Sequence, residues 1–237
     1  MLTACTNILQ KNSGRANLFK VLQYLTKTMA VHLKDSDPKN VWVGNFNHAS
    51  NTINTARKML TLGGWIDTLE QSRSVMAKTP CDIFRKLSNY CNAIYLLFDN
   101  VVFLQRIKIT QLLGEKAAKT AMFAFFMSQL FALIADLITI SELTSRERTQ
   151  PLDNNLASIR ALRKTSRERQ WLYATVLMRL GNMIYSSNGF DLGLNLVGSN
   201  FSERSVAWSG LIAGLIALAQ GAEKSINETR ELYKGQY

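Results

Sequence analysis

The chain has 237 residues, a mass of 26.7 kDa and a formal net charge of +11, because 28 Lys and Arg outnumber 17 Asp and Glu. Its length and its hydrophobic content of 47% exclude extensive disorder, and three prolines with thirteen glycines are too few turn signals for a many-stranded sandwich or repeated βαβ units. We therefore predict an all-α protein whose partner carries phosphate, either nucleic acid or an anionic membrane surface.

Basic residues are concentrated in the first half of the chain. Residues 1–119 hold 16 basic and 7 acidic side chains, against 12 and 10 in residues 120–237. Juxtamembrane basic segments are attracted to anionic headgroups. We predict that 1–119 is a region of basic amphipathic helices that binds a membrane surface.

The first predicted element is a helix over residues 13–34. Its apolar residues recur at helical spacing on one side, whereas Lys20, Lys27 and Lys34 fall seven apart on the opposite side. Such a helix can lie in a bilayer interface with its lysines among lipid phosphates, although a surface helix of a soluble bundle has the same pattern. The predicted membrane-binding residues are Arg15, Leu18, Lys20, Val21, Leu22, Leu25, Lys27, Met29 and Lys34.

Two further helical segments follow in the basic half. Residues 50–78 are amphipathic around the pair Arg57 and Lys58, and Gly63-Gly64 predicts a bend within them. Residues 87–105 are apolar over 94–98 and 101–104, but six polar side chains make a membrane span costly. We expect 87–105 to pack on its neighbours or to sink halfway into the interface, and a first membrane span there is the alternative.

Residues 120–141 form the first candidate membrane span. Their one charge is Asp136, and large apolar residues occupy one side while small and polar residues occupy another. An acidic residue in an apolar helix marks a functional site or pairs with a basic neighbour. Residues 142–204 carry a basic cluster between Arg146 and Arg169 and are expected to be a basic linker with helices.

Residues 205–222 form the second and stronger candidate span. These eighteen residues carry no charge, and a helix of that length reaches roughly 27 Å, close to the thickness of a bilayer's hydrocarbon core. A buried helix of a soluble core is the alternative. Residues 223–237 are expected to be a short tail, and their basic residues favour a cytosolic position. A stripe of small residues predicts close helix packing: Ala207, Gly210, Gly214, Ala217 and Gly221.

The sequence contains no pattern typical of an enzyme, a metal site or a cofactor site. Cys5, Cys81 and Cys91 lack paired spacing, which disfavours a disulfide framework or a zinc knuckle. His32 and His48 stand in no metal-ligand frame, and no nucleophile elbow, Walker loop or dinucleotide fingerprint occurs. We therefore expect no catalytic, cofactor-binding or metal-binding residues.

Four segments resemble conserved stretches of the peroxisomal biogenesis factor 11 family. The run S-G-R-A-N-L-F-K-V-L-Q-Y at 13–24 is similar to the opening of that family, and A-R-K-M-L-T-L-G at 56–63 resembles its S-R-K-x-x-R-L-G segment. The run Y-L-L-F-D-N-V-V-F-L at 95–104 resembles its Y-x-x-x-D-N segment, and G-L-I-A-G-L at 210–215 its glycine-bearing C-terminal membrane helix. Thr61 departs from the pattern, since the family often has a basic residue there.

The resemblance implies an integral protein of the membrane of peroxisomes, or of glycosomes if it is of the trypanosomatid type, with both termini towards the cytosol. It also implies elongation of the membrane before organelle division, self-association into homo-oligomers and recruitment of fission machinery. Spans at 120–141 and 205–222 would place both termini on one side.

The residues supply a mechanism for elongation, in which the 13–34 helix inserts into one leaflet and expands it. The alternative function is a small-solute channel or transporter lined by Asp99 and Asp136, with Ser128 and Thr139 on the second helix. A soluble nucleic-acid-binding bundle is a third hypothesis, which we disfavour because the lysine stripe is not interleaved with aromatic residues.

Overall fold

The computed structural model describes residues 12–110, 114–149, 156–192 and 200–234, and this part of the chain is helical throughout. The all-α prediction is thereby confirmed. The first predicted helix is α2 (Asn12–Ser36), and the bend predicted at Gly63-Gly64 separates α3 (Val41–Leu60) from α4 (Gly64–Ser74). Gly63 has a φ of 77°, a left-handed conformation that glycine adopts without strain.

The later helices are longer than the apolar segments that predicted them. Segment 87–105 lies in α5 (Pro80–Arg106), which begins earlier because Thr79 caps the helix, Pro80 is its first residue, and Thr79 and Asp82 form a capping box. Segment 120–141 lies in α6 (Glu115–Thr149), and α7 (Leu156–Gly189) follows it. Segment 205–222 lies in α9 (Glu203–Lys234), so helix continues into the expected tail. Two helices, α6 and the 203–227 part of α9, are long and apolar enough to cross a membrane.

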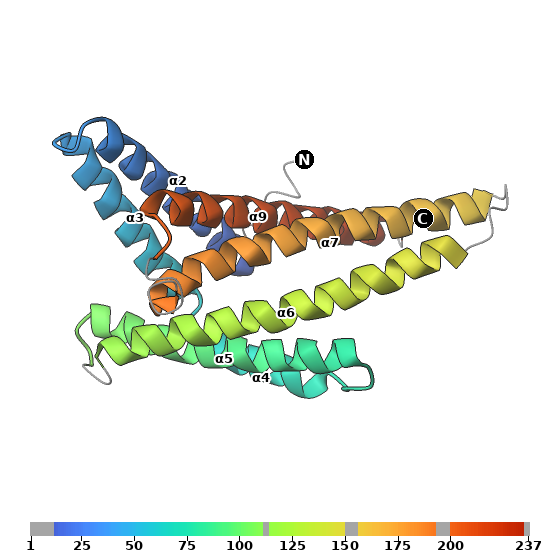
Figure 1. Cartoon of the computed structure of the whole chain (residues 1–237). Coiled ribbons are helices and arrows are strands. Elements are labelled where there is room, and N and C mark those ends of the chain that lie inside the picture. The colour runs from blue at the N-terminus through green and yellow to red at the C-terminus, as the bar shows by residue number, and fades with distance from the viewer. Residues whose placement is uncertain (1–11, 111–113, 150–155, 193–199, 235–237) are drawn as a thin grey trace.

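The helices pack mainly in the spatial order α4, α5, α6, α7, α9, α2, α3, and α3 also touches α5. Helices α5, α6, α7 and α9 lie side by side, while the hairpin of α2 and α3 is inclined to them at one end (Figure 1). Pairs of polar contacts fix the directions. Between α6 and α7, Asp136 meets Arg179 and Glu147 meets Arg169. Between α9 and α7, Gln220 meets Thr175 and Glu223 meets Arg167. Helix α7 is therefore antiparallel to both neighbours, and α6 and α9 run in the same direction.

The interior is built from small and polar side chains. The buried residues of α6 are all Ala, Ser, Gln or Asp, whereas its Phe123 and Leu137 are 52% exposed. Helix α9 buries Ala207, Gly210, Ala213 and Gly214 and exposes a stripe of large apolar residues at helical spacing, Trp208, Ile212 and Leu215. This distribution is the reverse of that in a water-soluble bundle.

Glycine allows the closest helix approaches. A Cβ atom at Gly210 would overlap with the ring of Tyr24 from α2, and one at Gly181 of α7 would lie 2.8 Å from the carbonyl oxygen of Ser209. A Cβ at Gly221, in contrast, would meet nothing within 4 Å. The stripe predicted for helix packing thus contacts α2 through Gly210 and Gly214, while Gly221 at its far end is open.

These two glycines give a matched pair of variants. Gly210→Ala should lower the melting temperature of the detergent-solubilised protein, because the Tyr24 ring must leave its buried position. Gly221→Ala should leave it unchanged or raise stability by up to about 1 kcal/mol, since alanine is the better helix former. Thermal unfolding followed by circular dichroism measures both, and equal melting temperatures for the two variants would contradict the packing of Tyr24 on Gly210.

Candidate functional site

Helix α2 turns three of its large apolar residues outward. Leu22, Leu25 and Met29 are 38%, 43% and 46% exposed, and we call these three residues the outer stripe. The opposite side of the helix is packed on the protein, with Gln23 and Tyr24 buried. Such an orientation is unfavourable in water, because it exposes apolar area and removes polar side chains from solvent.

Each residue of the lysine stripe lies beside a partner from another helix, and only Lys34 is exposed. Lys20 Nζ donates a hydrogen bond of 2.7 Å to Asn182 Oδ1 on α7, and burial, together with the nearby Arg57, lowers the pKa of Lys20 to about 7. Lys27 lines a cavity of about 230 Å³ with Glu203. Lys34 is exposed and forms an ion pair of 3.1 Å with Glu203. The periodicity located both faces of α2, but it did not reveal that the lysine face has protein partners.

The remaining residues predicted on this helix take different places. Arg15 is exposed at its N-terminal end, Leu18 is half-buried, and Val21 is half-buried where it contacts Gly214 of α9. The structure therefore brings together Leu22, Leu25 and Met29 on one exposed face. Among the small residues predicted for packing, Ala207, Gly210 and Gly214 are buried, whereas Ala217 and Gly221 are half-buried.

A buried polar cluster joins the α2–α3 hairpin to the remaining helices. We call it the polar joint, and its residues are Tyr24, Arg57, Lys58, Tyr95, Asp99 and Tyr185. Tyr24 is 1% exposed and packs edge-on against Tyr185 of α7 with ring centroids 5.7 Å apart. The other members surround a cavity of about 70 Å³. The joint unites residues from α2, α3, α5 and α7 near the end of the bundle where the hairpin lies.

An ion pair between Lys58 of α3 and Asp99 of α5 lies at the centre of the joint. Their side chains are 6% and 5% exposed. Burial lowers the pKa of Lys58, and the attraction of Asp99 offsets only part of that effect. A buried charge without its partner is strongly destabilising, so neither residue can be neutralised alone without cost.

A second set of polar contacts connects α6 to its neighbours. Asp136 accepts a bond of 2.5 Å from Arg179 of α7, and Asn182 donates to Gln129 at 3.1 Å. Ser128 accepts from Ser88 of α5 through its backbone oxygen at 2.9 Å. The carboxylates that the channel hypothesis requires, Asp99 and Asp136, are thus both held in ion pairs.

Helix α7 carries a long stretch with a single charge, although it is less apolar than the two candidate spans in α6 and α9. Residues 172–190 carry one charge, Arg179, and that charge is the partner of the one charge in 120–141. Tyr173, Leu177 and Leu180 are exposed at helical spacing. The average hydropathy of this stretch is lowered by Gly181, Asn182, Ser186 and Ser187. Sequence reasoning did not identify Arg179 as the partner of Asp136, although a single acid in an apolar segment signalled that a basic partner was needed.

Buried titratable groups elsewhere suggest no reaction. Among the described residues, no three His, Cys, Asp or Glu side chains are placed to hold a metal ion. The thiol of Cys81 contacts Thr139 and the backbone oxygen of Ala135, which is a packing role, and Cys5 lies outside the described residues. The arrangement offers an apolar outer surface that can contact an apolar medium, and buried ion pairs that hold the helices together.

The Lys58–Asp99 pair can be tested by a double-mutant cycle. Asp99→Asn or Lys58→Met alone should lower stability by about 3–5 kcal/mol, because each leaves a buried charge or a buried polar group without its partner. The double variant should regain most of that loss, since both charges are absent. Chemical unfolding in detergent gives the three free energies, and additive losses in the double variant would show that the two side chains do not interact.

Comparison with known proteins gives one match. The model of the peroxisomal biogenesis factor 11 family matches residues 2–222, which is nearly the whole chain. No curated protein and no solved structure matches significantly. The stretches at 13–24, 56–63 and 95–104, whose sequences resemble the family, lie within this matched range and supply five of the six residues of the polar joint, so they meet in space.

Proposed function

The chain belongs to the peroxisomal biogenesis factor 11 family, and from this premise we propose that it elongates its membrane by holding the outer stripe of α2 in one leaflet. The family comprises non-enzymatic proteins of the peroxisomal membrane that act in peroxisome proliferation and membrane elongation. The proposal concerns how this chain does so, and it applies equally if the organelle is a glycosome.

The observation that carries the proposal is the orientation of α2. Leu22, Leu25 and Met29 point away from the protein while Lys20 and Tyr24 point into it. Transfer of such side chains from water to an apolar medium is favourable by roughly 1.5–3 kcal/mol for each one fully buried. A helix that enters only one leaflet expands that leaflet and bends the membrane. Arg15 at the exposed start of the helix is suited to anionic headgroups.

The role of the outer stripe can be distinguished from an effect of the protein's net charge with two triple variants. The first variant combines Leu22→Glu, Leu25→Glu and Met29→Glu. It should abolish tubulation of anionic liposomes and strongly reduce membrane elongation in cells, because the stripe can no longer enter lipid. Asn47→Glu, Asn51→Glu and Thr52→Glu on the exposed side of α3 make the same charge change as a control. Electron microscopy of the liposomes scores tubules, and tubulation that persists only in the control supports the proposal. Equal tubulation by both variants would refute it.

We further propose that α6, α7 and α9 cross the membrane together. Helices α6 and α9 run in the same direction, so they cannot both cross unless the chain returns between them, and α7 packs antiparallel to both. Its residues 172–190 offer that return, since their single charge is neutralised by Asp136. Three crossings put the start of α6 and the end of α9 on opposite sides, which departs from the two-span arrangement expected from the sequence.

Cysteine labelling distinguishes three crossings from two. Cysteines are placed at Arg148 near the end of α6 and at Ser202 before α9, in a chain whose own three cysteines are replaced by serine. Three crossings put these positions on opposite sides, so a membrane-impermeant maleimide should label one and spare the other in intact organelles. Two crossings would leave the whole 150–202 segment on one side, and identical labelling of both cysteines would exclude α7 as a span.

Self-association is the remaining part of the proposal. Gly210 and Gly214 of the small-residue stripe are covered by α2 of the same chain, so we look for the contact between copies on another surface. Helix α5 offers one with alternate spacings of four and three: Ile83, Leu87, Tyr90, Ile94 and Leu97, all exposed. Contacts between such stripes would keep many copies of α2 on one patch of membrane, to which fission machinery could be recruited.

A further inference from the structure

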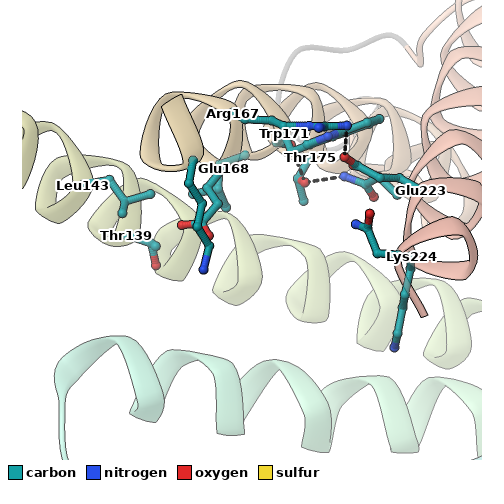
Figure 2. A pocket seen from close by; sticks show the side chains of 12 residues that line it. Thr139, Leu143, Arg167, Glu168, Trp171, Thr175, Glu223 and Lys224 are labelled. Carbon is teal, nitrogen blue, oxygen red and sulfur yellow. Dashed lines mark hydrogen bonds and ion pairs between the residues drawn. The ribbon is translucent and has the colours of Figure 1, made fainter. Parts of the chain in front are cut away.

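A large groove opens between α6, α7 and α9 at the end of the bundle opposite the polar joint. Its volume is about 1250 Å³, above the roughly 300–1,000 Å³ of common small-molecule sites. Figure 2 shows side chains from all three helices facing it, among them Leu143 of α6, Trp171 of α7 and Glu223 of α9. The groove is therefore large enough for a ligand bigger than most metabolites, and much of its wall is apolar.

The groove lies at the ends of the apolar segments of α6 and α9, where it can meet lipid. Thr139 and Leu143 lie at the end of the apolar stretch of α6, and Gln220 and Glu223 lie at the end of the uncharged 205–222 run in α9. In the membrane arrangement proposed above, on which this inference rests, the groove thus begins within the hydrocarbon region and opens at its boundary. Acyl chains of the surrounding bilayer are the apolar molecules available at that depth.

The charges at the rim of the groove favour a negatively charged lipid headgroup. Arg167 of α7 pairs with Glu223 of α9 at 2.6 Å, and Gln220 donates to Thr175 at 2.6 Å, so these residues hold the two helices together. Lys164 and Lys224 are exposed, line the groove and make no ion pair with another described residue, and Glu168 is the one further acid at the rim. The rim therefore carries a net positive charge beside an aromatic side chain, Trp171, of the kind found at membrane interfaces.

We propose that this groove binds one anionic diacyl phospholipid of the surrounding bilayer. Its acyl chains lie against Leu143, Trp171 and Leu172, and its phosphate lies at the mouth near Lys164 and Lys224. Basic pockets between membrane helices bind acidic headgroups in this way. The bound lipid fills a space that the helices leave open and would link the ends of the two flanking spans.

Native mass spectrometry of the full chain in detergent tests the proposal with palmitoyl-oleoyl phosphatidylglycerol and, separately, palmitoyl-oleoyl phosphatidylcholine as probes. We expect one phosphatidylglycerol per chain to survive detergent exchange, and phosphatidylcholine to be lost. Lys164→Glu with Lys224→Glu should weaken retention about tenfold or more. Lys39→Glu with Lys78→Glu, an equal charge change at exposed positions outside the groove, should retain the lipid. Leu143→Asn, which puts a neutral amide of similar size against the acyl chains, should also weaken retention.

Each other outcome overturns the proposal. Equal retention of the two lipids would show that the basic rim does not select the headgroup. Equal loss of the lipid from both lysine variants would show that only the net charge of the protein matters. Unchanged retention by Leu143→Asn places the lipid elsewhere on the protein. The outer-stripe variant of α2 should keep the bound lipid although it no longer tubulates liposomes, so failure of the groove and failure of the proposed function give different results.

Discussion

The structure depends on a reversal of the usual distribution of side chains between inside and outside. In a water-soluble bundle, large apolar residues bury because water excludes them. Here Ala121, Ala124 and Ala132 lie inside α6, while Phe123 and Leu137 lie outside. Between lipid-facing helices there is no hydrophobic difference to exploit, so close contact of backbones and satisfied polar groups must supply the stability. Glycine allows close backbone contact where α2 and α7 cross α9. Ion pairs between α6 and α7 satisfy buried polar groups.

The polar joint connects this general constraint to the action of one helix. Lys58 and Asp99 attach α3 to α5, and Tyr24 attaches α2 to α9 through Gly210. Because the joint holds the inner side of α2, the direction of Leu22, Leu25 and Met29 is fixed by residues that never meet lipid themselves. This gives a physical reason for the segments shared with the family to meet here: they orient the stripe that the proposed function places in the membrane.

The sequence predicted the helices and the faces of α2 well, but it did not predict which residues contact one another. The 3.6-residue period located α2 and separated its lysine face from its apolar face, yet only the tertiary structure shows that Lys20 bonds Asn182, 162 residues away. The glycine stripe predicted a close helix contact and could not say that the contact lies within the chain. Residues 172–190 have a lower average hydropathy than the two candidate spans, in part because they include Asn182, which is buried and bonded to Gln129 of α6. Asp136 signalled a missing cation without identifying Arg179.

The distribution of these contacts along the bundle bears on how bending would be produced. Ion pairs join α7 to its neighbours at several levels, through Asp136 near the middle and through Glu147 and Glu223 towards one end, so the three long helices cannot slide past one another without separating charges. Helix α2 is fixed to that unit by Tyr24, and its withdrawal from lipid would require the polar joint to open. Within the proposed function, insertion is therefore a property of the folded chain and not a response to binding. Curvature would then be set by how many copies gather in one patch, which makes the contacts between copies the step at which elongation can be regulated.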